Sequence, residues 1–427
     1  MDTIFALATA QGRAGVAVIR ISGPKALESA ERLCGPLPAV RQAGLRQLRD
    51  NNGETLDQAL ILSFAGPHSF TGEDVVELHM HGSVAVVAAV LNCLGAGDAR
   101  LAEPGEFTRR ALENDKMDLA QVEGLGDLIA SETEGQRRQA LRLVEGALGK
   151  KIETWRSNLI RAAALIEVTI DFADEEVPVD VSPEVLSLLE SVRMEVETEL
   201  SGFAAAERIR TGFEVAIIGP PNAGKSTLLN ALAKREAAIT SERAGTTRDV
   251  IEVRMDLNGY AVTLLDTAGL RDGEDEIEVT GIERAVSRAN AADLRIFLAE
   301  PHDNLPVPFV DGDIRVAPKA DTRMDNKPAV SGKTGAGIPE LIGTISGALS
   351  KKTQAAGLAT HARHKDAMQA SLIALQYASE CVGNGPNHYD IAAEEIRTSI
   401  RSLEALVGRI GVENLLDEIF SSFCLGK

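Results

Sequence analysis

The spacing of hydrophobic and polar residues divides the chain into parts with different periodicities. In residues 1–118, strand-like runs alternate with helix-like runs, which is typical of a compact α+β domain. The run EDVVELHMHG alternates apolar and polar residues, as a strand with one buried face does, and its polar face would carry Glu77, His79 and His81. Neighbouring runs predict strands at 15–22 and 56–66 and helices at 24–35 and 83–97.

From residue 119 the periodicity becomes helical. Apolar residues recur at intervals of three or four from Leu141 to Ile166, which predicts one long amphipathic helix. An acidic, proline-containing break follows, and further helical runs occupy 185–203 and the chain after residue 351. We therefore predict a multidomain α+β and α/β protein, with an α+β domain at 1–118, a discontinuous all-α domain at 119–211 and 351–427, and an α/β domain inserted at 212–350.

Composition restricts the classes of partner and compartment. The formal net charge is −19, and nucleic-acid binding draws much of its affinity from Lys and Arg that neutralise phosphates. If the protein works on RNA, we expect a partner to supply much of the basic surface. The four cysteines form no CxxC pair, which argues against a zinc ribbon, an iron–sulfur site or a disulfide framework. No run of 18 apolar residues and no basic signal region occur, so we expect a cytoplasmic protein that does not enter a membrane.

The strongest motif is GPPNAGKS, which runs from Gly219 to Ser226 and matches the phosphate-binding loop G-x-x-x-x-G-K-[ST]. It follows an apolar strand and opens a helix, which is the context that this motif requires. The backbone N–H groups of such a loop surround the phosphates, and the helix dipole favours their negative charge. Lys225 can neutralise the β- and γ-phosphates, and the Ser226 hydroxyl can bind Mg²⁺.

Further motifs follow in order along the chain. AGTTRD supplies Thr247 as a second magnesium ligand, and LLDTAG supplies Asp266 for the metal shell. APKAD and SGKTG complete a set that resembles the guanine-binding motifs of small G proteins, with Asp321 positioned to accept hydrogen bonds from guanine. Pro318 departs from that pattern, in which an Asn stands, so we expect weaker binding of GTP that still exceeds binding of ATP.

The residues leave the hydrolytic machinery open. Leu270 stands where Ras-like proteins have a glutamine that orients water, and Arg248 and Arg271 are the possible arginine fingers. A bound monovalent cation can supply the same positive charge, and Asn222 has a carbonyl oxygen to bind one. Four acidic residues could orient water in place of the glutamine, namely Glu274, Glu276, Glu278 and Glu283.

Together with GVAVIRISG, FTGEDVVEL, ARLAEPGEFTRRALENDKMDLAQ, DTAGLR, GIERA and the ending SSFCLGK, these motifs resemble the MnmE (TrmE) family of tRNA modification GTPases over essentially the whole chain. The resemblance implies a homodimer with an N-terminal folate-binding domain, a discontinuous helical domain and an inserted Ras-like G domain. It also implies an FAD-dependent MnmG-type partner in a heterotetramer or larger complex, with tRNA bound mostly through that partner. The implied product is an aminomethyl or carboxymethylaminomethyl group on C5 of the wobble uridine, made with a 5,10-methylene- or 5-formyl-tetrahydrofolate donor.

The same resemblance assigns roles to residues of this sequence. Glu278 becomes the residue that activates water, Lys225 a second catalytic residue and Cys424 a further candidate. The implied GTP-binding residues are Asn222, Ala223, Gly224, Lys225, Ser226, Thr227, Ser241, Thr246, Thr247, Asp266, Thr267, Ala268, Gly269, Lys319, Asp321, Ser331, Gly332 and Lys333. The implied metal ligands are Ser226 and Thr247 for Mg²⁺, with Asp266 acting through water, and Asn222, Ser241, Arg243 and Thr246 for K⁺. The implied folate ligands are Arg20, Glu77, Lys116 and Lys427.

Three alternatives stay open at this point. Glu77, His79 and His81 could hold a metal, although a plain polar sheet face is the stronger interpretation. Cys424 is either a functional thiol or a small buried side chain, since its acidic and apolar surroundings do not fit a prenylation signal. We expect Gly426 to let the C-terminal backbone approach the N-terminal domain of the dimer mate closely. The rival functions are a ribosome-assembly GTPase and a regulatory GTPase switch.

Overall fold

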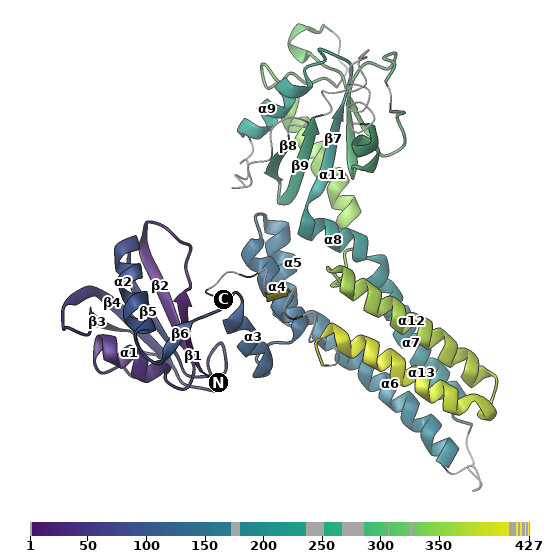
Figure 1. Ribbon diagram of the computed structural model, residues 1–427. Coiled ribbons are helices and arrows are strands. Elements are labelled where there is room, and N and C mark those ends of the chain that lie inside the picture. Colours follow the sequence, from purple (N-terminus) through teal and green to yellow (C-terminus); the bar gives the residue numbers. More distant parts are fainter. Residues whose placement is uncertain are drawn as a thin grey trace, which may run out of the picture. The chain divides into compact units, whose positions relative to one another are not determined.

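The computed structural model describes residues 2–171, 180–235, 252–266, 286–305, 307–324 and 328–409, and residues 416, 419–420, 423 and 426 near the C-terminus. The chain divides into two compact units (Figure 1). The first comprises Met1–Gly126 and Glu404–Lys427, and the second comprises Asp127–Leu403. Within the described residues, no helix is long and apolar enough to span a bilayer.

The first unit is built on a six-stranded sheet in the order β3-β4-β5-β2-β1-β6. Its strands are β1 (Thr3–Leu7), β2 (Ala14–Ser22), β3 (Gly44–Arg49), β4 (Thr55–Phe64), β5 (Val75–Gly82) and β6 (Ala99–Leu101). Its helices are α1 (Ala26–Cys34), α2 (Val84–Gly95), α3 (Glu106–Glu113) and most of α4 (Leu119–Ala130). The strands and helices expected in this part of the chain are therefore confirmed.

The two faces of this sheet differ, as the alternation in EDVVELHMHG indicated. On β5, Val76, Leu78 and Met80 are buried and belong to the core that α1 and α2 complete. Glu77 points to the opposite face, where Phe107 of α3 packs in a smaller apolar cluster. The period of two thus places apolar residues in the core and leaves polar groups on the face that α3 partly covers.

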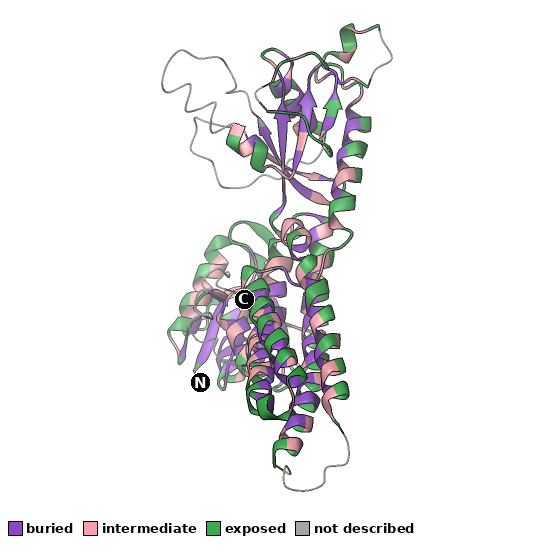
Figure 2. Cartoon of the chain, turned by 90° about the vertical axis from the view of Figure 1, so that its right-hand side faces the viewer, coloured by how far each residue is buried: buried purple, intermediate pink, exposed green. Residues whose placement is uncertain are grey.

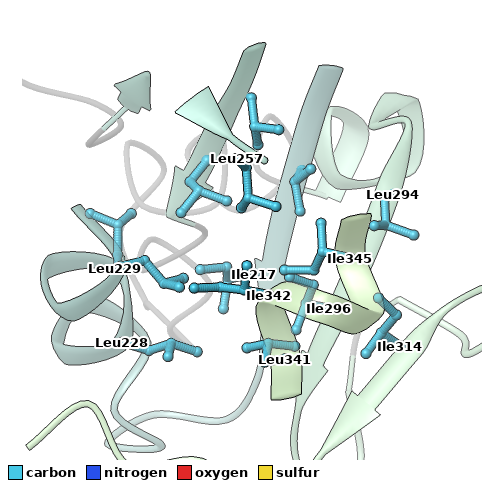
Figure 3. Packing of buried hydrophobic residues seen from close by; sticks show 14 of the residues in the cluster. Ile217, Leu228, Leu229, Leu257, Leu294, Ile296, Ile314, Leu341, Ile342 and Ile345 are labelled. Carbon is cyan, nitrogen blue, oxygen red and sulfur yellow. The ribbon is translucent and has the colours of Figure 1, made fainter. Parts of the chain in front are cut away.

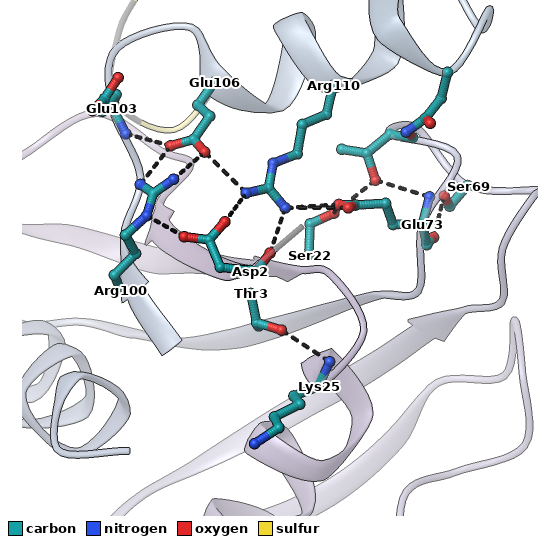
Figure 4. Close-up of polar contacts among 12 residues, drawn as sticks. Asp2, Thr3, Ser22, Lys25, Ser69, Glu73, Arg100, Glu103, Glu106 and Arg110 are labelled. Atoms are coloured by element: carbon teal, nitrogen blue, oxygen red, sulfur yellow. Dashed lines mark hydrogen bonds and ion pairs between the residues drawn. The ribbon is translucent and has the colours of Figure 1, made fainter. Parts of the chain in front are cut away.

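A buried arginine holds α3 to this opposite face (Figure 4). Arg110 donates to Glu73 at 3.1 Å, to Glu106 at 2.9 Å and to the Asp2 carboxylate at 2.8 Å. Its side chain is 6% exposed, so these carboxylates compensate a guanidinium that has lost most of its water. Hydrogen bonding by Arg100, and to a smaller extent by Arg110, lowers the pKa of Asp2, so the network keeps its charge at neutral pH.

The second unit contains a helical bundle. Its helices are α5 (Glu134–Val144), α6 (Ala147–Asp171), α7 (Ser182–Ser201), α8 (Phe203–Thr211), α12 (Ala362–Gly383) and α13 (Tyr389–Leu406), of which α13 reaches into the first unit. Helix α7 packs against both α6 and α12, so the helical tracts before and after the inserted segment form one bundle. Figure 2 shows the buried stripes that these helices turn towards one another.

The single long helix expected from Leu141 to Ile166 is wrong. Helix α5 ends at Val144 and α6 begins at Ala147, so the apolar stripe belongs to two helices. Gly146 lies between them with φ +76°, a left-handed conformation that glycine adopts without steric cost and that an α-helix does not contain. Intervals of three or four residues survive such a break, so periodicity alone did not reveal it.

The inserted α/β segment contains a five-stranded sheet in the order β11-β10-β7-β9-β8. The strands are β7 (Phe213–Ile218), β8 (Glu252–Leu257), β9 (Tyr260–Asp266), β10 (Leu294–Leu298) and β11 (Ile314–Val316), and only β8 runs antiparallel to its neighbour. Helices α9 (Lys225–Arg235) and α11 (Ile338–Thr353) pack on one face, where Leu228, Leu229, Leu341 and Ile345 meet Ile217 and Ile296 of the strands (Figure 3).

Candidate functional site

The phosphate loop follows β7, the strand at which the order of strands in the sheet reverses. The chain enters it from the carboxyl end of β7, which lies between β10 and β9, and leaves it as α9. Such a switch point is where open α/β sheets bind their ligands. A Cβ on Gly219 would come within 2.4 Å of the Leu298 carbonyl oxygen, so the loop begins in direct contact with the end of β10 and only glycine fits there.

The Lys225 side chain folds back onto the phosphate loop. Its ammonium group donates to the carbonyl oxygens of Gly219 at 2.8 Å and Pro220 at 3.1 Å. The side chain is buried, so the loop carbonyls hold a positive charge within the loop that is predicted to bind the β- and γ-phosphates. Ser226 and Thr227 follow on the exposed side of the first turn of α9.

The middle of the loop has an unusual backbone. Asn222 has φ +60° and Gly224 has φ +95°, while Ala223 between them is buried. Asparagine tolerates the left-handed region better than most residues, because its side chain can form local hydrogen bonds. The conformation leaves the Asn222 side chain exposed, so its carbonyl oxygen is accessible to a ligand.

The two segments predicted to recognise the base are joined to one another by backbone hydrogen bonds. The Ala320 N–H donates to the Val330 carbonyl at 3.1 Å, and the Val330 N–H donates to the Ala317 carbonyl at 2.9 Å. These bonds bring Asp321 next to the turn that starts at Ser331. The Ser331 hydroxyl lowers the pKa of the exposed Asp321 carboxyl, with smaller contributions from Lys333 and Lys319, so Asp321 remains an ionised acceptor.

Gly332 fixes these segments to the phosphate loop. A Cβ at this position would lie 2.6 Å from the Thr227 carbonyl and 2.7 Å from the Leu228 backbone nitrogen. The turn from Ser331 to Lys333 therefore rests on the first turn of α9, close to Ser226. Lys319, Asp321, Ser331, Gly332 and Lys333 are thus brought together with Asn222 to Thr227 around one end of the sheet.

Other predicted site residues lie outside the described residues. They are Ser241, Arg243, Thr246, Thr247, Thr267, Ala268, Gly269, Glu278, Cys424 and Lys427, and of Asp266 only the backbone is described. Their roles in binding magnesium, potassium, GTP or folate stay predictions.

In the first unit, Arg20 of β2 and Glu77 of β5 are cross-strand partners. The Arg20 guanidinium donates to one Glu77 oxygen through Nη2 at 2.9 Å and Nε at 3.1 Å, and the other Glu77 oxygen lies 3.2 Å from His79. The rings of Phe70 and Phe107 lie 5.3 and 5.8 Å from the guanidinium carbon. The two charged side chains are only 21% and 17% exposed, so they form a sheltered pair with aromatic walls.

Lys116 lies near the loop that carries Phe70. Its Cε would lie 3.0 Å from a Cβ on Gly72, two residues after Phe70, although the residue as a whole is exposed. His81 pairs with Asp57 at 2.8 Å instead of sharing a ligand with Glu77 and His79. Among the described residues no cluster of His, Cys, Asp or Glu is arranged to hold a metal ion.

The described residues near the C-terminus pack on the first unit. A Cβ on Gly105 would meet the Phe420 ring at 2.9 Å, and a Cβ on Gly126 would meet the Phe423 ring at 3.0 Å. Gly426 is buried, and a Cβ there would lie 2.1 Å from the Leu7 carbonyl oxygen, so the close backbone approach agrees with the expectation. In the structure this contact is made within one chain, whereas we expected it on the dimer mate.

Sequence reasoning named the charged residues of this face but missed their surroundings. Phe107 comes from α3 and Phe70 from a loop, and only the fold brings both rings to Arg20. His79 was considered as a metal ligand, whereas its contact with Glu77 is that of a neighbouring hydrogen-bonding group. The run FTGEDVVEL contains both Phe70 and Glu77, but the sequence does not show that the two side chains both contact Arg20.

Comparison with known proteins gives full-length matches. A family model described as the MnmE helical domain matches residues 119–424, and one described as the GTP-binding protein TrmE N-terminus matches residues 3–116. Proteins named tRNA modification GTPase MnmE from Roseobacter denitrificans and Ruegeria pomeroyi are 64% and 62% identical, with 100% of this chain and of each relative covered.

A solved structure of Era from Aquifex aeolicus bound to GDP·AlF4⁻ matches more narrowly. Its identity is 28%, the match covers 31% of this chain and 55% of that chain, and the TM-score is 0.25. The assignment therefore rests on the family models and the full-length relatives. By both criteria the chain belongs to the MnmE family of tRNA modification GTPases, and it is a GTP hydrolase.

Proposed function

We propose that this GTPase works with an FAD-dependent MnmG-type partner to install an aminomethyl or carboxymethylaminomethyl group on C5 of the tRNA wobble uridine. One observation carries the proposal: a single chain combines a phosphate loop in one unit with a sheltered Arg20–Glu77 pair in the other. A ribosome-assembly or regulatory GTPase switch needs the first feature but gives no reason for the second. The proposed setting is a cytoplasmic homodimer within a heterotetramer or larger complex, in which the partner supplies most of the tRNA contacts because this chain carries a net charge of −19.

The proposed GTP site uses the phosphate loop and the base-recognition turn. Lys225 and the backbone of the loop bind the phosphates, while Asp321 and the Ser331–Lys333 turn bind guanine. Mg²⁺ fits the oxygen donor of Ser226 at the start of α9, and Thr247 and Asp266 would complete its shell. In the proposed mechanism, Glu278 orients the attacking water and bound K⁺ supplies positive charge through Asn222, Ser241, Arg243 and Thr246.

The proposed folate site is the sheltered face around Arg20 and Glu77. The Glu77 oxygen that contacts His79 keeps acceptor capacity beyond that contact, which suits the ring N–H and amino donors of a pterin, and Phe70 and Phe107 offer apolar walls. Lys116 and Lys427 would bind the acidic part of the folate, and the ligand would be a 5,10-methylene- or 5-formyl-tetrahydrofolate. Cys424 would act as a thiol in this reaction or fill space next to it.

Mass spectrometry of tRNA nucleosides tests the proposed reaction directly. In cells that lack this protein, we expect the C5-modified wobble uridines to disappear, and expression of the intact chain should restore them. Wobble uridines that remain fully modified without the protein would exclude the reaction and favour a GTPase switch with another target.

The Glu77→Gln substitution tests the folate site. We expect binding of 5-formyltetrahydrofolate to weaken by about 10- to 100-fold, because a hydrogen bond to a charged group contributes about 1.5–3 kcal/mol. Isothermal titration of the full-length protein measures this, with Glu54→Gln in an exposed turn as the matched control. Equal affinity of wild type and Glu77→Gln would place folate elsewhere, and GTP hydrolysis should be unchanged in both variants.

Asp321 should determine the choice of nucleotide despite Pro318. We expect the protein to bind GTP more tightly than ATP, and Asp321→Asn to lose about 10- to 100-fold in GTP affinity while ATP affinity stays the same. Fluorescent nucleotide titration gives both dissociation constants, and Asp311→Asn, also at an exposed position of the second unit, serves as the control. Equal binding of GTP and ATP by the wild type would contradict this assignment.

Potassium dependence gives the fourth test of this subsection. We expect GTP hydrolysis to be about 10-fold or more faster in KCl than in NaCl at equal ionic strength, because K⁺ would offset charge at the β/γ bridge. In Asn222→Gly the difference should vanish, since glycine keeps the left-handed backbone at φ +60° but lacks the carbonyl oxygen. If Asn222→Gly responds to K⁺ as the wild type does, Asn222 is not a potassium ligand.

A further inference from the structure

The inserted α/β segment is attached to the helical part of the second unit at its two chain crossings. Arg210 lies at the end of α8, just before β7, and its Nε donates to the Thr360 carbonyl at 3.0 Å, just before α12. The chain therefore leaves the helical part and returns to it at one place. The Arg210 carbonyl also accepts from the Gln136 amide at 2.9 Å, which ties both crossings to α5.

A third attachment is not a chain crossing. The turn between β8 and β9, at Asn258 and Gly259, lies against the first turn of α5, where the Gly135 N–H donates to the Gly259 carbonyl at 2.9 Å. Near it, Arg254 of β8 forms an ion pair with Glu132 at 2.8 Å. Figure 1 allows the strands β8 and β9 and the helix α5 to be located.

The N-terminus of α5, which contacts the hairpin turn, is stabilised by side-chain capping. Thr133 caps the helix, and its side chain and that of Gln136 each accept a hydrogen bond from the other residue's backbone, which forms a capping box. The packing is close, because a Cβ on Gly135 would lie 2.7 Å from the Gly259 carbonyl oxygen. A shift of the hairpin turn beyond the normal range of hydrogen-bond lengths therefore moves the start of α5 or breaks this hydrogen bond.

The opposite end of the hairpin leads to the nucleotide motifs. In the sequence, two residues separate AGTTRD from the start of β8 at Glu252, and β9 ends at Asp266, the first residue of DTAG. The two strands are paired without interruption from Glu252↔Leu265 to Leu257↔Tyr260. β8 is the edge strand of the sheet and β9 is also paired with β7, so a continuous ladder of hydrogen bonds joins the motif end of the hairpin to its turn.

A cavity next to the contact gives the turn room to move. It has a volume of about 540 Å³ and is lined by Arg138 and Arg142 of α5, by Asn258 and Tyr260 at the turn, and by Thr353 at the end of α11. The cavity is lined by Gly259 of the turn and by Gly135 of α5, so it borders the contact itself.

We propose that the β8–β9 turn is the contact through which the nucleotide bound at the phosphate loop controls the arrangement of α5 in the helical part. The two crossings joined by Arg210 act as a pivot, and the Gly259–Gly135 contact reports the position of the hairpin. A difference between the GTP-bound and GDP-bound states at the end of β9 is carried through the paired strands β8 and β9 to α5. The inference needs only GTP hydrolysis at the phosphate loop, so failure of the folate or potassium proposals leaves it standing.

The Gly135→Ala substitution disturbs the contact between α5 and the hairpin turn without weakening the helix. Alanine favours a helix more than glycine does, so α5 itself should not weaken, while the added Cβ displaces the Gly259 carbonyl. Gly343→Ala on α11 is the matched control, because its Cβ would meet nothing within 4 Å. Both variants are made in the full-length chain.

Hydrogen–deuterium exchange of the α5 amides, with GDP and with a non-hydrolysable GTP analogue, measures the coupling. We expect wild type and Gly343→Ala to show at least a threefold difference in exchange rate between the two nucleotides at residues 135–140, and Gly135→Ala to show none. GTP hydrolysis at saturating nucleotide should stay within about threefold of wild type. Equal exchange with both nucleotides in the wild type, or a preserved difference in Gly135→Ala, would overturn the proposal.

A charge exchange keeps the test decisive if Gly135→Ala fails to fold. Glu132→Arg and Arg254→Glu should each reduce the nucleotide-dependent difference by placing like charges opposite one another, and the double variant should restore it. A double variant that behaves like either single variant would show that the hairpin position does not govern α5.

Discussion

The structure depends on a constraint of connectivity: a GTPase domain has to leave a helical bundle and rejoin it without opening it. The bond from Arg210 to the Thr360 carbonyl meets that constraint, because it joins the outgoing and returning segments. Asp127 stands behind it, paired with His361 at 3.1 Å and within 4.0 Å of Arg210. With the crossings held together, α7 can pack on α6 and α12 as it would in an uninterrupted bundle.

Close backbone approaches organise the predicted nucleotide site more than side chains do. Gly219 brings the phosphate loop onto the end of β10, and Gly332 brings the base-recognition turn onto α9. Both contacts are too short for any side chain, so the distance between the phosphate and base regions is set by the main chain. The acidic chain presents a local positive charge there through Lys225 and the N-terminus of α9, which is where an anionic ligand needs it.

Sequence patterns predicted local features well and tertiary contacts poorly. The alternation in EDVVELHMHG assigned Glu77 to the polar face of its strand, and the glycine and lysine spacing located the phosphate loop. Gly146 separates α5 from α6 although the apolar intervals continue across it, so periodicity overestimated the helix. The contacts of Gly135 with Gly259 and of Phe107 with Arg20 join residues far apart in the chain, and no local pattern encodes them.

The bond between the two chain crossings has a consequence for how the α/β segment can be inserted or replaced. A module whose two ends lie together can enter an existing helical protein without separating the helices on either side of the insertion point. Residues between Arg210 and Thr360 therefore form a module that is attached to the bundle at the joined crossings and at the hairpin turn with its neighbouring Arg254–Glu132 ion pair. Another GTPase with the same spacing of ends could be grafted in its place, and its hairpin turn would decide whether the host senses it.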